Sequence, residues 1–300
     1  MFLLAEGGHH TPLIVDFVNH YLGKPVHEFQ MAVMYPFWQR LFDAVGLKTT
    51  PDAIFGAYTV ENAIPWYTVM FFIACLLTIF LIWVFKGKLS EDDPTHGQLT
   101  LEAGFLAIKD MVVNVIGEHG FKYFPVVATF AVLILVSNLM GLFPLFMSPT
   151  AHVNVTFALG ITSFVYYNYV GIRENGLVGH LKHFAGPIWW IAPLIFSIEL
   201  FSNLIRPMTL GIRLFANMFA DEQIASIISG LFPPFTQFLV PVILLPLAVF
   251  IAFVQTLVFT LLSMIYLSEV SHPPHDEHHE PHDAFHVENE HSNATVAHAA

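Results

Sequence analysis

Charged residues are scarce in this chain of 300 residues. Asp, Glu, Lys and Arg together make up 11% of the sequence, whereas hydrophobic residues make up 55%. A soluble domain carries about 25% charged residues, so much of the surface of this protein is expected to face lipid. Basic residues are the scarcer kind, and the formal net charge is -12. This excludes nucleic acid as a partner, because phosphate binding needs an excess of Lys and Arg.

Cysteine is nearly absent, and the common catalytic motifs are missing. The single cysteine, Cys75, excludes a disulfide framework and any multi-cysteine metal site. The sequence has no G-x-x-x-x-G-K-[ST] loop for a nucleotide, no His-Glu-x-x-His and no Gly-x-Ser-x-Gly. No histidine lies inside a long apolar segment, which argues against an axial haem ligand. We therefore expect no metal, no cofactor and no catalytic site, and an intramembrane enzyme is disfavoured.

Five apolar segments are long enough to span a bilayer, which takes about 20 mostly apolar residues per helix. Their bounds are about 66–85, 124–146, 153–170, 188–229 and 233–267. We therefore predict an all-α, polytopic membrane protein with a membrane domain over 66–267. The connection 147–152 is short and has no Lys or Arg, which predicts that the second and third spans form a tight hairpin.

The last two apolar segments are too long for helices that cross the bilayer upright. At a rise of 1.5 Å per residue, the 35 residues of 233–267 reach about 52 Å, against a hydrocarbon core of about 30 Å. Each segment must either tilt or break, and Pro207 and Pro241 make kinks possible. No run of loop residues divides either segment, so we predict two long, tilted helices.

One helix of a different character is expected before the second span. Over 101–120, apolar residues recur at spacings of four and three. Charged residues such as Lys109 and Asp110 fall mostly elsewhere on the helical wheel. This pattern predicts an amphipathic helix that lies at the membrane surface or packs against the bundle.

The two ends of the chain lie outside the membrane domain. Residues 1–65 are predicted to be an N-terminal extracytoplasmic segment. Residues 268–300 hold eight His and seven Asp or Glu and are predicted to be a disordered tail, with a metal-binding tail as the alternative. Lys and Arg concentrate in the connections after the first and third spans. The positive-inside rule then places the N-terminus outside and the C-terminus in the cytoplasm.

The fourth segment carries a polar face through its apolar sequence. Glu199, Arg206 and Arg213 are spaced by seven residues, which returns to nearly the same face of an α-helix. Asn203 and Asn217 each follow one of these charges by four residues and join that face. An arginine at the bilayer centre costs about 2.5–3.5 kcal/mol on insertion scales, so these charges are expected to face protein or water.

Each charge on this face needs a partner. Glu199 and Arg206 are close enough in sequence to pair with each other in a structural role. Arg213 has no acid one turn before it, so its partner must come from elsewhere, including another subunit. Gln255, deep in the last segment, is the natural partner for Arg213. The alternative is that Gln255 bonds to a neighbouring helix, as a lone Gln in such a helix often does.

The order of the charges along this helix suggests a mechanism. In the predicted orientation Glu199 lies nearest the cytoplasm, Arg213 in the middle, and Asp221 and Glu222 toward the outside. Carboxylates on either side of a fixed positive charge can serve two water-filled half-channels. The arginine between them would block direct passage of protons by electrostatic repulsion.

Several motifs of the sequence resemble one known family. The run TLGIRLFANMFADE over Thr209–Glu222 is similar to the signature of subunit a of the F-type ATP synthase. The resemblance covers about 66–268. Further matching features are Asn138–Pro144, Glu199 fourteen residues before Arg213, Arg206-Pro207, and Gln255 followed by Met264–Ser268.

This resemblance implies a function, partners and residue roles. The protein would be the stator subunit of the membrane sector in a bacterial inner membrane, bound to the c-ring and to b-type peripheral stalk subunits. Arg213 would face the ring carboxylates and separate two proton half-channels. Glu222 and Asn217 would border the outer path. Glu199 would lie on the inner path, and Gln255 would hold the arginine.

The sequence departs from that family at one position. Many members carry an ionisable residue one helix repeat before the glutamine of the last segment, where this chain has Ala248. Asp221 is expected to compensate for it. The remaining polar residues of the matched segments are expected to have supporting roles: Arg206, Asn138 and Asn203.

A secondary transporter is the alternative function. It too would use charged residues inside the membrane. Many transporters are built from internal repeats, and none is apparent in this sequence. Five spans also divide poorly into two halves.

Overall fold

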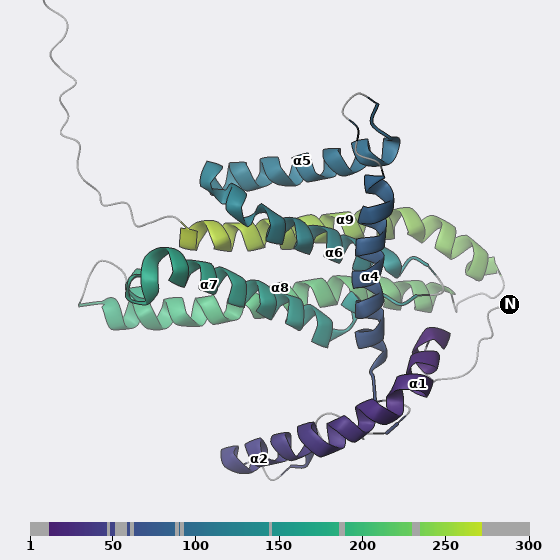
Figure 1. The fold of residues 1–300 in the computed structure, drawn as a ribbon, viewed down its shortest axis with the longest axis horizontal. Helices are drawn as coiled ribbons and strands as arrows, with labels where there is room; N and C mark the ends of the chain where they lie inside the picture. The colour runs from purple at the N-terminus through teal and green to yellow at the C-terminus, as the bar shows by residue number, and fades with distance from the viewer. Residues whose placement is uncertain are drawn as a thin grey trace, which may run out of the picture.

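The computed structural model describes residues 12–46, 49–51, 59–60, 63–87, 90, 93–143, 146–185, 190–229 and 235–271. Regular structure within these ranges is helical throughout, as the sequence predicts (Figure 1). The short elements are the π-helix η1 (Gln30–Met34) and the 3-10 helices η2 (Glu118–Tyr123) and η3 (Pro149–Ala151). The α-helices are α1 (Leu13–Phe29), α2 (Tyr35–Val45), α4 (Trp66–Lys86), α5 (His96–Ile116), α6 (Phe124–Met140), α7 (Val153–Ala185), α8 (Ala192–Ser229) and α9 (Phe235–Ser271).

Four segments among the described residues are long and apolar enough to cross a membrane. They are Trp66–Lys86, Glu118–Met140, Val153–Gly176 and Leu244–Ser271. The all-α membrane class is therefore confirmed. The remaining expected span, the fourth along the chain, is α8, which carries five acidic or basic residues within its 38 residues and does not belong to this group. The count of five spans stays a prediction.

The last two helices are long, continuous and inclined to the first span. In Figure 1, α4 runs upright, whereas α8 and α9 lie side by side and cross it steeply. The two helices have 38 and 37 residues, and α8 continues through Pro207. The prediction that neither segment breaks is confirmed, and their tilt relative to the bilayer stays a prediction.

The amphipathic helix begins and ends earlier than its expected bounds of 101–120. The side chain of Thr95 caps α5 by accepting a hydrogen bond from the Gln98 amide at 3.3 Å, which extends the helix N-terminally. Gly117 ends it with φ = 93°, a conformation that favours glycine. The helix crosses one end of α4 in Figure 1.

The expected tight hairpin between the second and third spans is wrong. Helices α6 and α7 follow each other in the chain, but in the described residues they barely touch, and each packs against α9 instead. Side chains of α9 such as Met264 and Leu267 fill a core that also holds Val127 of α6 and Tyr167 of α7. The connection is not a simple turn, because η3 lies inside it and packs against α8.

Two glycines let α7 and α8 approach closely. A Cβ atom at Gly160 of α7 would lie 2.6 Å from the backbone oxygen of Pro207 on α8. A Cβ atom at Gly211 of α8 would lie 3.1 Å from the backbone oxygen of Thr156. Small residues of this kind allow membrane helices to pack backbone against backbone. This crossing fixes α8 two residues before Arg213.

The N-terminal segment contains helices that lie near the other end of α4. Figure 1 shows α1, η1 and α2 in succession below that end. Asn19 is buried and exchanges two hydrogen bonds with the backbone of Ile64, at 3.0 and 3.1 Å. Gln30 donates to the backbone oxygen of Ala63 at 2.8 Å. These bonds tie the N-terminal helices to the residues that lead into α4.

Candidate functional site

Arg213 lies on an exposed face of α8 and has no ion pair among the residues that the structure describes. Its exposed neighbours one turn before and after it are the polar Thr209 and Asn217, and the surface around them is largely apolar. Exposed large hydrophobic side chains on α8 and α9 include Met208, Ile212, Phe219, Phe250 and Val254. An arginine in a largely apolar surface of a membrane protein is costly without an acidic partner. The described part of the chain supplies none.

Asn217 and Gln255 connect α8 to α9 one helical turn beyond Arg213. The Asn217 amide donates to Gln255 Oε1 at 2.5 Å, and Gln255 is buried. Of the two partners considered for Gln255 from the sequence, Arg213 or a neighbouring helix, the structure shows the second, through Asn217 of α8. The Nε2 atom of Gln255 is buried and has no hydrogen bond within the described residues.

A hollow of about 310 Å³ lies between α8 and α9 beside this pair. Asn217, Asp221 and Gln255 provide its polar lining, and the rest of the lining is mostly apolar. Asp221 therefore shares one cavity with the amide pair next to Arg213. Ala248, the position of the family departure, is buried on α9.

Glu222 lies against a buried polar cluster that connects the end of α6 to η3. Its carboxylate interacts with the backbone of Ser148. The Ser148 hydroxyl donates to the Ser137 backbone oxygen at 3.1 Å and lies 2.7 Å from the Thr150 hydroxyl. Thr150 in turn donates to Asn138 Oδ1 at 2.7 Å. All four members of this cluster are at most 1% exposed.

Two atoms of this cluster lack a partner among the described residues. They are the Ser137 hydroxyl and the Asn138 Nδ2, both buried. A buried donor without a hydrogen bond costs about 1–3 kcal/mol unless water satisfies it. Asn138 was predicted from the sequence, whereas Ser148 and Thr150 were not, because hydroxyl groups in a loop near a span form no distinctive sequence pattern.

Arg206 binds two acids at the other end of α8. It lies 3.3 Å from Glu199, so the structural pairing considered from the sequence is confirmed. It also makes two shorter bonds, of 2.6 and 2.9 Å, to the carboxylate of Glu269 on α9. The ring of Tyr266 lies under the guanidinium at 5.1 Å. Glu269 was missed because it falls in the segment assigned to the tail.

Asn203 is buried against α7 and does not share the exposed surface of Arg213. The hydroxyl of Tyr167 bonds to its side-chain and backbone oxygens. Its amide donates to Asn168, which also contacts His180. The predicted polar face of α8 therefore meets three environments. Asn203 contacts α7, Arg206 contacts α9, and Arg213 lies on the exposed surface of the helix bundle.

No group of three or more His, Cys, Asp or Glu that could hold a metal ion occurs in the described residues. The His-rich segment 272–300 lies outside those residues, so the predicted disordered tail and its metal-binding alternative are both untested there. Cys75 is a free cysteine in α4.

Comparisons with known proteins agree on one family. The model of the family described as ATP synthase A chain matches residues 68–268. "ATP synthase subunit a" of Geobacter sulfurreducens is 43% identical over 195 residues, which cover 65% of this chain and 82% of the relative. "ATP synthase subunit a" of Desulfosudis oleivorans is 38% identical over 234 residues, covering 78% and 95%. That of Trichlorobacter lovleyi is 46% identical over 174 residues, covering 58% and 74%.

Proposed function

The chain belongs to the ATP synthase A chain family, and we propose that it forms two proton half-channels that meet at Arg213. Family membership makes it a proton-translocating subunit of the membrane sector of an ATP synthase, and it decides against a secondary transporter. The observation that carries the finer proposal is the exposed Arg213, which lacks an acidic partner among the described residues and lies in a largely apolar surface. The partner we propose is the carboxylate of a c-ring subunit.

Arg213 would act on each ring carboxylate as it passes. Two unit charges 4 Å apart attract by about 4 kcal/mol at an effective dielectric constant of 20, which favours the ionised form of the carboxylate. The ring carboxylate would therefore release its proton on approaching the arginine and take up another after leaving it. The same positive charge would repel protons and keep the two half-channels separate.

We assign the outer path to the end of α8 that holds Glu222. The buried hydroxyls and amide beside Glu222 offer a chain of polar atoms, and the Ser137 hydroxyl and Asn138 Nδ2, unpartnered within the described residues, suit bound water. Asn217 and Gln255 would border the path at Arg213. Asp221, which lines the same hollow, would supply the ionisable group that Ala248 lacks.

We assign the inner path to Glu199 at the opposite end of α8. This assignment uses the positive-inside orientation, with the N-terminus outside and the C-terminus in the cytoplasm. One charge crossing 100 mV is worth about 2.3 kcal/mol, so several protons are needed for each ATP. A repeating rotor such as the c-ring delivers them, and b-type stalk subunits would hold this chain against the rotation.

Cross-linking to the ring tests this proposal. In a Cys75→Ser background, Ile212→Cys places a thiol on the 48% exposed face beside Arg213, whereas Leu210→Cys places one at a 2% exposed position on the same helix. The c-ring subunit is given a cysteine one turn from its carboxylate. Oxidation should then form a disulfide between the ring and Ile212→Cys, but none between the ring and Leu210→Cys. A cross-link from Leu210→Cys alone would show that the opposite face of α8 meets the ring, and would contradict the proposal.

A further inference from the structure

Within the described residues, the shortest ion pair of α8 joins Arg206 to Glu269. Neither of the two proposed half-channels uses Glu269. Glu269 lies in the last turn of α9 and receives both terminal nitrogens of Arg206, at 2.6 and 2.9 Å. This is the two-bond fork geometry that makes arginine–carboxylate pairs strong and directional. The guanidinium also contacts Glu199 Oε1, at the longer distance of 3.3 Å.

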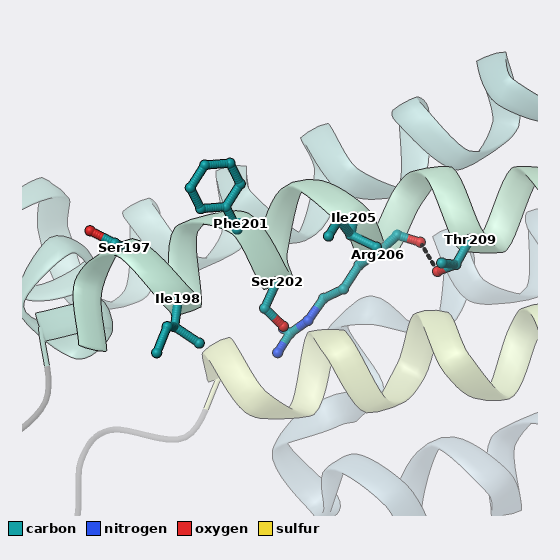
Figure 2. Close-up of a pocket in the computed structure, with 7 residues that line it drawn as sticks. All are labelled: Ser197, Ile198, Phe201, Ser202, Ile205, Arg206 and Thr209. Atoms are coloured by element: carbon teal, nitrogen blue, oxygen red, sulfur yellow. Dashed lines mark hydrogen bonds between the residues drawn. The ribbon is translucent and has the colours of Figure 1, made fainter. Parts of the chain in front are cut away.

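The surroundings hold the guanidinium on the α9 side. In Figure 2 the side chain of Arg206 extends from α8 toward the last turns of α9, alongside Ser202. The ring of Tyr266 on α9 lies 5.1 Å from the guanidinium, within the range of a cation–π contact. The Arg206 side chain is 17% exposed, whereas those of Glu199 and Glu269 are 32% and 36% exposed.

Arg206 also borders an open hollow on α8. The hollow has a volume of about 520 Å³, and Ser197, Ser202, Arg206 and Thr209 give it polar edges among apolar side chains (Figure 2). Glu199 lies on the same helix and keeps one carboxylate oxygen, Oε2, without a hydrogen bond among the described residues. Glu199 does not line the hollow, but its side chain is partly exposed and its contact with Arg206 is the longer of the two, so a proton can reach Oε2 without first breaking a two-bond ion pair.

We propose that Glu269 is a positioning residue, which engages Arg206 in a two-bond pair and so leaves Glu199 free to relay protons. This inference rests on the proposed inner path through Glu199. Removal of the Glu269 charge would leave Arg206 with one acid in reach. The guanidinium would then turn toward Glu199 and form the fork there, because an unpaired charge in this partly buried place is costly. Glu199 would be held as an ion-paired carboxylate and would exchange protons slowly.

The test is ATP-driven proton pumping in inverted membrane vesicles that carry the complete ATP synthase. Glu269→Gln removes the charge and keeps the shape. We expect it to lower pumping about tenfold, less than the 10²–10⁴-fold that a positioned proton-transfer group commonly contributes, because Glu199 is hindered and not removed. Glu269→Asp, which keeps the charge, should recover much of the rate. Complex assembly and ATP hydrolysis are measured on the same vesicles.

A double variant separates positioning from a purely structural role. Arg206→Gln in the Glu269→Gln background removes the cation that would capture Glu199, so pumping should rise again severalfold. If Glu269 only ties α8 to α9, the double variant will pump no better than Glu269→Gln, and the proposal is overturned. Glu174→Gln removes another exposed ion pair, that with Lys122, and should pump normally as the matched control.

Two parallel variants distinguish this inference from the function on which it rests. Glu199→Gln should also pump slowly. Normal pumping by Glu199→Gln beside slow pumping by Glu269→Gln would overturn the positioning role. Normal pumping by Glu269→Gln would overturn it as well. Normal pumping by Arg213→Ala would instead contradict the proposed function itself.

Discussion

The close crossing of α7 and α8 predicts a severe effect from one added methyl group. A Cβ atom at Gly160 would lie 2.6 Å from the Pro207 backbone oxygen, and ordinary contact begins at 3.4 Å. The helices would have to separate by about 0.8 Å, and the obstacle is backbone that cannot rotate away. Overpacking of this kind costs about 1–3 kcal/mol.

The displacement would reach the proposed proton path. Arg213 lies six residues after Pro207 on α8, so it moves with the crossing point. A misplacement of about 1 Å can cost about 10²-fold in rate at a positioned site. We expect Gly160→Ala to lower ATP-driven pumping in vesicles at least about tenfold and to lower the melting temperature of the solubilised complex.

A matched substitution controls for the glycine itself. A Cβ atom added at Gly104 of α5 would have no atom within 4 Å, so Gly104→Ala should leave pumping unchanged and stabilise the helix by about 0.5–1 kcal/mol. Gly211→Ala, with 3.1 Å to its nearest atom, should fall between the two. Wild-type pumping and melting in Gly160→Ala would refute the reasoning that this crossing positions Arg213.

Two further predictions concern Asp221, in the hollow between α8 and α9, and His152, in the connection before α7. Asp221→Asn should slow ATP-driven pumping, and Ala248→His in that background should restore part of it; wild-type flux in Asp221→Asn would remove the compensating role. His152 stacks on Tyr67 at 3.9 Å, and burial lowers its pKa. The unfolded chain therefore binds a proton more readily, so stability should fall as pH drops below about 6.5. Melting of His152→Phe, which keeps the stacking, should depend less on pH, and an equal dependence would contradict this.

The membrane helices could be predicted from the sequence because apolar length is a strong and local signal. Which helices pack against each other could not be predicted in this way. Helices α6 and α7 are joined by few residues, which suggested a hairpin, yet α9 packs against both. Contacts between segments far apart in sequence depend on how their side chains fit together, and a hydropathy pattern does not contain that information.

The charges of α8 were found from their spacing, but their partners were found only in part. A repeat of seven places Glu199, Arg206 and Arg213 on one face and leaves open what each one meets. Glu269 was overlooked because the last span was expected to end at 267, whereas α9 continues to Ser271. The last four residues of α9, 268–271, were therefore left out of the predicted span, and they include Glu269, the main partner of Arg206.

The central claim is that Arg213 is both the partner of the ring carboxylate and the barrier between the half-channels. The most direct test is Arg213→Ala in vesicles that carry the complete ATP synthase, with ATP-driven pumping and passive proton uptake measured together. We predict that pumping is lost, that the peripheral sector still hydrolyses ATP, and that passive proton uptake through the membrane sector rises. Unchanged pumping and unchanged passive uptake would contradict the claim and reduce Arg213 to a structural charge.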